Sequence, residues 1–131
     1  MEHTDIQANT EKLLMTTKEI LKQIGSFIKE PVNTENPSEV IDKLTQAVSL
    51  LSTSAWSVAE SQKVYTQKVY EEAQKHTKIS PTMAKMLISG ACKDEKYAVD
   101  LAEGYNKELH YTIEALRTAL SYIKEERKQN Y

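Results

Sequence analysis

Turn-forming and cross-linking residues are scarce in this sequence of 131 residues, which contains three glycines, three prolines and one cysteine. A sheet protein with many hairpins needs more glycine and proline than this, so the composition favours an all-α fold. The lone cysteine, Cys92, has no second cysteine with which to form an intrachain disulfide. The length fits one domain, and we expect residues 1–131 to form it.

Long apolar runs are missing as well. The longest are only a few residues, far below the ~20 that a bilayer-spanning helix needs. The polar start from Met1 to Asp5 is not followed by the apolar region of a signal peptide. The net charge of −2 gives no bulk attraction to nucleic acid or anionic lipid. We therefore expect a soluble, cytoplasmic protein without membrane association, in which any anion binding rests on local charge.

Catalytic, metal-binding and nucleotide-binding motifs are also absent. The sequence has no glycine-rich phosphate loop and no nucleophile elbow. The three histidines lie on separate predicted elements, and Cys92 has no sequence neighbour that would activate its thiol. Four carboxylates lack a histidine at metal-ligand spacing, and we expect them to form a charged solvent face: Asp94, Glu95, Asp100 and Glu103. We expect no enzymatic activity, no metal and no cofactor.

What the sequence does contain is apolar residues that recur every three or four positions. The longest such stretch, residues 37–76, predicts one long helix. Asn36 can cap its first N–H groups, Pro37 suits its first turn, and Glu39 stands where it would complete a capping box. The predicted buried seam consists of Ile41, Leu44, Val48, Leu51, Ala55, Val58, Gln62, Tyr65 and Val69.

A first helix is predicted over about residues 4–29. Its apolar residues fall seven apart at Ile6, Leu13, Ile20 and Phe27. Thr10 and Thr17 occupy a seam position that Ile24 fills further along, and these polar residues weaken the N-terminal half of the packing.

A third helix is predicted over residues 81–127, starting at the cap formed by Ser80 and Pro81. Its seam is predicted to comprise Met83, Leu87, Ala91, Ala98, Leu101, Tyr105, Leu109, Ile113, Leu116, Leu120 and Ile123. The four-residue steps from Leu101 to Ile113 predict a stutter, and Gly90 and Gly104 predict a kink or close packing. A tyrosine line outside this seam, Tyr97, Tyr111 and Tyr122, offers a second packing face.

These helices of unequal length predict an elongated bundle with coiled-coil-like packing. The first helix would span ~40 Å and the other two ~60–70 Å. Residues 63–93, called the tip below, would then be a two-helix extension that buries little apolar surface. We expect a second chain to cover the tip, giving a homo-oligomer. The alternative is a third helix that breaks near Gly90 and folds back into a compact four-helix monomer.

The tip carries six lysines and two glutamates, a local balance of +4. Aromatic side chains between cations suit an anionic or stacking ligand, whereas a merely solvated lysine face is the alternative. The helix over residues 37–76 has no arginine, which argues against base contacts. A tryptophan outside the seam fits either the edge of the core or an interface. The candidate binding residues are Trp56, Lys63, Lys68, Tyr70, Lys75, Lys78 and Lys85.

Three segments of the C-terminal half resemble small all-helical proteins encoded by bacteriophages: MAKML at 83–87, YAVDLA at 97–102 and ALRTALSY at 115–122. The resemblance is one of general character over about a third of the chain. Proteins of that kind include accessory factors of phage recombination, which touch single-stranded DNA, and counter-defence proteins that bind a host factor or trap a nucleotide signal. The resemblance implies a binder that works by occupancy in the host cytoplasm.

Together these observations lead us to expect a non-enzymatic binding protein. It would sequester a host macromolecule or a small anionic, nucleotide-like ligand, in the manner of a phage counter-defence factor. A single-stranded nucleic-acid accessory protein of phage recombination and a purely structural coiled-coil adaptor are the alternatives. Steep loss of affinity with salt would separate the nucleic-acid binder from the adaptor.

Overall fold

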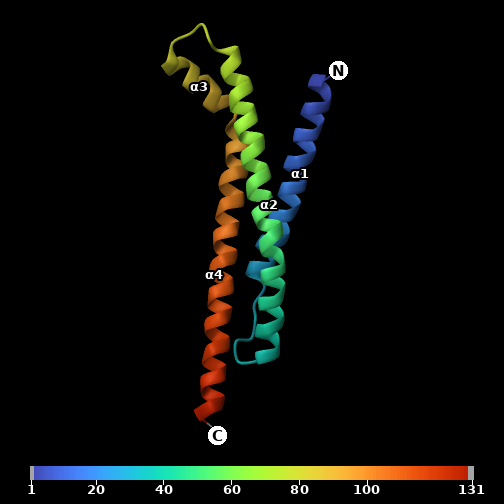
Figure 1. The fold of residues 1–131 in the computed structure, drawn as a ribbon, viewed down its shortest axis with the longest axis vertical. Coiled ribbons are helices and arrows are strands. Elements are labelled where there is room, and N and C mark those ends of the chain that lie inside the picture. The colour runs from blue at the N-terminus through green and yellow to red at the C-terminus, as the bar shows by residue number, and fades with distance from the viewer. Residues whose placement is uncertain (1, 130–131) are drawn as a thin grey trace.

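The computed structural model describes the backbone of residues 2–129 and the side chains of residues 16–129. That part of the chain forms four α-helices and no strand: α1 (Glu2–Lys29), α2 (Pro37–Lys75), α3 (Pro81–Ala91) and α4 (Lys93–Gln129). The predicted all-α class is confirmed. α2 and α4 form a long hairpin, α1 packs along one side of it, and α3 lies at the end opposite the chain's C-terminus (Figure 1). None of the described helices is long and apolar enough to cross a bilayer.

The start of α2 is fixed by the cap that the sequence predicts. The side-chain oxygen of Asn36 accepts a hydrogen bond from the N–H of Ser38 at 3.1 Å. Glu39, however, does not complete a capping box, because the N–H of Asn36 already donates to the carbonyl of Asn33 at 3.1 Å. The Glu39 carboxylate instead accepts from the N–H of Asn33 at 3.0 Å and so ties the α1–α2 connection to the first turn of α2.

The single helix predicted over residues 81–127 is two helices. Ser80 caps α3 as predicted, since its hydroxyl oxygen accepts from the N–H of Met83 at 3.3 Å. The break falls at Cys92, whose φ of −102° and ψ of 13° depart from helical values. It lies two residues beyond Gly90, so the predicted position is nearly right. α3 stays at the end of the hairpin rather than folding back along it, and the molecule is elongated (Figure 1).

The buried residues of α2 each lie one position before a residue of the predicted seam. Ile41 and Val48 are 48% and 47% exposed, whereas the neighbouring Val40 and Ala47 are fully buried. The buried residues of α2 are Val40, Lys43, Ala47, Ser54, Ser57, Ser61 and Val64. Small side chains at the centre let two helices approach closely, which moves the larger apolar side chains to the edges of the contact. A seam chosen from the large apolar residues of the sequence therefore lies at the edge of the contact and not at its centre.

The serines at this contact do not leave unpaired hydroxyl groups. The hydroxyls of Ser57 and Ser61 donate to carbonyls of their own helix, at 2.7 Å and 3.0 Å. Ser54 accepts a hydrogen bond at 2.9 Å from the side-chain amide of Asn106 on α4. A line of polar residues can therefore be buried here at little cost.

In α4 the predicted seam is largely confirmed, since Ala98, Leu109, Ile113 and Leu116 are buried, but Leu101 is only partly buried. Glu95, Ala102, Leu109 and Leu116 are buried at seven-residue intervals, which is a regular heptad. The predicted stutter through Leu101 is therefore wrong, because the small Ala102 occupies the contact instead. Nothing lies within 4 Å of a Cβ built on Gly104 or on Gly90, so the predicted close packing at Gly104 is also wrong.

The largest core cluster lies where α1 meets the hairpin, around Phe27, Ala47, Leu109 and Ile113. Thr17, which the sequence marks as a weak point, is buried nonetheless. The side chains of Ile6, Thr10 and Leu13 lie outside the described residues, so the weakened N-terminal packing stays a prediction. The backbone of α1 diverges from the hairpin toward its N-terminus (Figure 1).

Candidate partner-binding surface at the tip

The tip buries very few of its side chains. No residue from 65 to 91 is buried, and the 11-residue helix α3 contains no buried side chain. Met83 and Leu87, predicted to begin a buried seam, are exposed, and Met86 is 71% exposed. These three side chains form what we call the outer face of α3. The prediction is wrong because α3 is set at an angle to α2 (Figure 1), and in α3 only Ala84 and Ile88 are even partly buried.

A shallow groove of about 410 Å³ lies between α2 and α3. Its lining is mostly apolar, and Lys85 is its one charged residue. The other lining residues are Tyr65, Val69, Pro81, Ala84, Ile88 and Ser89. A phosphate-bearing ligand in this groove would meet a single cation, which is fewer than the several donors that phosphate sites use.

The candidate lysines of the tip are not equivalent. Lys68 forms a 2.8 Å ion pair with Glu95 on α4, and Lys75 forms a 3.0 Å ion pair with Glu72 on its own helix. Lys78 and Lys85 are exposed and have no ion-pair partner among residues 16–129. The charge of Lys68 is therefore paired inside the molecule, and its predicted contact with an external anion stays a prediction.

The predicted exposure of Glu95, the partner of Lys68, is also wrong. Glu95 was expected on a solvent face, but it is buried at the start of α4, and one of its carboxylate oxygens has no hydrogen-bond partner among the described residues. The hydrogen bond to Glu95 raises the pKa of Lys68, which favours the charged ammonium form of this lysine. Burial raises the pKa of the adjacent Cys92 thiol, so this cysteine is held neutral. This cluster fixes the bend between α3 and α4.

The remaining candidates do not share a site with α3. Trp56 and Lys63 lie further down α2, where both side chains are exposed. About 28 Å of helix axis separates Trp56 from Lys75. Of the seven candidate residues, Trp56 therefore lies outside the tip, and Lys63 lies at the margin of the tip farthest from α3. The tyrosines of α4 that the sequence offers as a second packing face are exposed: Tyr97, Tyr111 and Tyr122.

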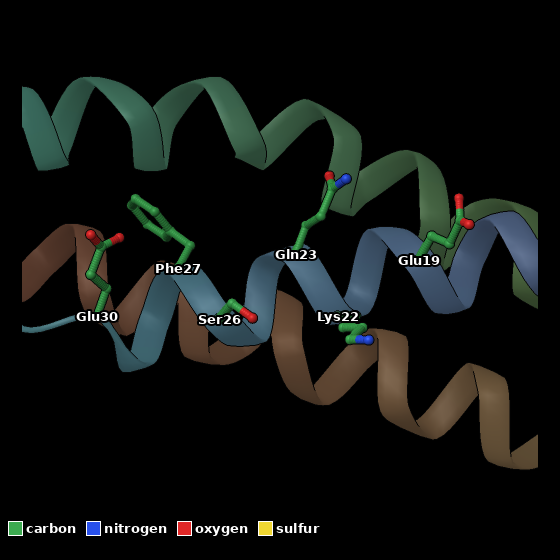
Figure 2. Close-up of a pocket in the computed structure, with 6 residues that line it drawn as sticks. All are labelled: Glu19, Lys22, Gln23, Ser26, Phe27 and Glu30. Atoms are coloured by element: carbon green, nitrogen blue, oxygen red, sulfur yellow. The ribbon is translucent and has the colours of Figure 1, made fainter.

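A larger depression of about 850 Å³ runs along α1, but it has no convergent chemistry. Five of its six lining residues come from that one helix and the sixth, Glu30, directly follows it, and Figure 2 shows them spread along its length. Phe27 points toward α2 and belongs to the core. Among the described residues, no group of histidine, cysteine and carboxylate side chains is arranged to hold a metal ion.

Two features were not predicted from the sequence, the burial of Glu95 and the exposure of α3, and the reasons differ. The burial of Glu95 has no local signal, because Lys68 lies 27 residues away and only the hairpin brings the two together. The exposure of α3 did have a signal, since Met83, Met86 and Leu87 precede a break that Ser89 and Gly90 already suggest. Comparison with protein-family models, curated proteins and solved structures finds no match to this chain.

Proposed function

We propose that this protein is a non-enzymatic binding protein that holds an acidic protein partner against the outer face of α3. One observation carries the proposal: an 11-residue helix with no buried side chain exposes Met83, Met86 and Leu87 side by side. So short a helix is marginal in water unless an apolar face is covered. A partner that covers these side chains would supply the missing burial.

The chemistry of the surface favours a protein partner. Methionine is unbranched and polarizable, and it suits adaptable protein contacts. The neighbouring cations Lys78 and Lys85 are exposed and form no ion pair with residues 16–129, and they would attract and orient an acidic surface. The resemblance to phage proteins gives this partner a biological setting, because a host protein occupied in this way would be withheld from its own function.

The observations support the other candidates less well. A nucleotide-like ligand would find one lysine in the groove between α2 and α3. A single-stranded nucleic acid would use stacking and phosphate contacts, for which the apolar outer face of α3 is poorly suited. Both remain outcomes of the experiment below.

The test compares wild type with Met83→Glu/Met86→Glu. Proteins retained by the immobilised wild type are identified, and the affinity of each purified candidate is measured by calorimetry. We expect the double substitution to weaken binding by about tenfold or more, because each carboxylate replaces apolar contact area. Tyr111→Glu, at an exposed position on α4, is the matched control and should bind like wild type.

A second variant, Lys78→Glu/Lys85→Glu, tests the acidic character of the partner. It should weaken binding mainly at low salt, since exposed charges are screened as salt rises. Equal affinity of the Met83→Glu/Met86→Glu variant would refute the proposal. So would tight, salt-dependent binding of a labelled single-stranded oligonucleotide that only the lysine substitutions abolish, which would establish the nucleic-acid alternative.

A further inference from the structure

A second exposed surface lies on α2, on the side turned away from α1 and α4. From Leu44 to Ala59 the sequence has sixteen consecutive residues without a charge, which is more than four helical turns. One side of this stretch is buried against α4, yet the other side is exposed. We call this exposed side the outward face of α2, and it comprises Ile41, Val48, Ser52, Ala55, Trp56 and Ala59. The solvent side of a surface helix typically carries charged residues, and the exposed side of this stretch has none.

The residues at the two ends of the outward face carry opposite charges. Asp42 lies beside Ile41 at the N-terminal end, and Lys63 lies one turn beyond Ala59 at the C-terminal end; both side chains are exposed, whereas Glu60, between Ala59 and Lys63, is partly buried. If two copies of α2 cross antiparallel between Ser52 and Thr53, residue 63 of each copy lies opposite residue 42 of the other. In the same register, residue 56 lies opposite residue 49, so the large Trp56 side chain faces the small Ser49. The face is therefore complementary to itself in charge and in size, as a twofold interface requires.

The chain exposes more surface than a compact monomer of its mass, and the excess is large enough for a dimer interface. The chain exposes 9681 Å², whereas a compact monomer of this mass exposes ~7,000 Å². The excess of about 2,700 Å² is larger than the ~800 Å² that each partner buries in a standard interface. Pairing along α2 is the simplest way for an elongated helical chain to reduce it.

We infer that two copies of this chain associate antiparallel through the outward faces of their α2 helices, with Trp56 of each copy packed beside Ser49 of the other. The interface leaves both α3 helices free at opposite ends of the dimer. This inference uses a different surface from the proposed function, so either can fail without the other.

The mass in solution is the first test. Light scattering coupled to gel filtration should give twice the chain mass of 14.9 kDa for wild type. Val48→Glu should weaken the dimer at least tenfold, because it places a carboxylate in the centre of an apolar contact. Tyr111→Glu is the matched control and should remain dimeric. A monomeric wild type at 100 μM, or a Val48→Glu variant as dimeric as wild type, would overturn the inference.

Charge reversal tests the register. Asp42→Lys and Lys63→Asp should each weaken the dimer at low salt, and combining the two substitutions in one chain should restore it, because each new lysine then faces a new aspartate. A double variant weaker than both single variants would overturn the antiparallel register.

Cross-linking tests the direction of the helices. Ser52→Cys places a thiol at the crossing point, where it should form a disulfide-linked dimer under mild oxidation. Thr66→Cys is exposed on the same helix but lies far from its counterpart in the antiparallel arrangement, and should not cross-link. The native Cys92 is buried and gives no background. Efficient cross-linking through Thr66→Cys would instead establish a parallel pair.

Discussion

A buried lysine of α2 binds the carbonyl groups at the C-terminal end of α1. The Lys43 ammonium group, on α2, donates to the carbonyl of Phe27 and, at 3.0 Å, to the carbonyl of Glu30, and it lies 4.0 Å from the centre of the Phe27 ring. The last carbonyls of a helix have no partner within the helix, and the helix dipole places negative charge there. Lys43 therefore satisfies two acceptors and attaches the end of α1 to the hairpin.

Lys43→Met should lower the free energy of unfolding by about 1–3 kcal/mol, since the methionine keeps most of the stem but removes the donor to the Glu30 carbonyl and leaves the Phe27 carbonyl with only the 3.3 Å hydrogen bond from the N–H of Glu30. Urea denaturation followed by circular dichroism measures this. Lys22→Met, at an exposed position on α1, is the control and should change stability by less than ~0.5 kcal/mol. Equal stability of the two variants would mean that water replaces the ammonium group without cost.

Lys68→Met should destabilise the protein by roughly 1–3 kcal/mol, because it removes the one side-chain donor that residues 16–129 offer to the buried Glu95 carboxylate. Lys68→Met/Glu95→Leu should recover part of this loss, since the unpaired carboxylate is then gone. The pKa of Lys68 is raised by Glu95, so the pair stabilises the folded state below the ordinary lysine pKa of 10.5. The stability difference between wild type and Lys68→Met should therefore persist from pH 7 to 10 and shrink above pH 10.5. A difference that is already lost at pH 8 would contradict this account.

Cys92 should react slowly with thiol reagents at neutral pH. Its side chain is buried, and burial raises the pKa of the thiol, so both access and the thiolate fraction are low. We expect the rate of disulfide exchange with an aromatic disulfide to be on the order of tenfold or more below that of the urea-unfolded chain. A rate equal to that of the unfolded chain would show that the α3–α4 bend opens freely.

At the level of the helices, glycine has different roles at two positions. A Cβ on Gly25 of α1 would lie 3.0 Å from the hydroxyl of Tyr105 on α4, so glycine permits the close approach of these helices. Gly104, in α4, faces open space. Gly104→Ala should stabilise the protein by about 0.5–1 kcal/mol through helix propensity. Gly25→Ala should gain less or destabilise, because Tyr105 must move. Thermal unfolding of the two variants compares them directly, and equal gains would mean that Tyr105 yields without cost.

Over the whole molecule, packing density falls from the α1 region toward the tip. The core cluster lies near Phe27 and Leu109, whereas residues 65–91 contain no buried side chain. Amide hydrogens of residues 65–91 should therefore exchange faster than those of residues 98–116, because local opening there breaks few apolar contacts. Hydrogen exchange with mass spectrometry measures this. Equal protection of the two segments in the isolated chain would contradict the low stability of the tip. A bound partner should slow exchange in α3 specifically.

The sequence by itself determined the helical class, the boundaries of α1 and α2, and the caps at Asn36 and Ser80. These features depend on neighbouring residues: apolar periodicity and capping side chains act within a few positions of the chain. It also placed the break in the third predicted helix to within two residues, from the glycine beside it.

Only the tertiary structure decided which side of α2 is buried and that α3 has no buried side. The seam on α2 passes through Ala47 and Ser54 rather than Val48 and Ala55, because close approach of α2 and α4 depends on the small side chains of both helices together. The same long-range pairing buries Glu95 with Lys68 and leaves the outer face of α3 uncovered. Local periodicity predicts that a helix has a buried side, whereas the fit to the neighbouring helix selects it.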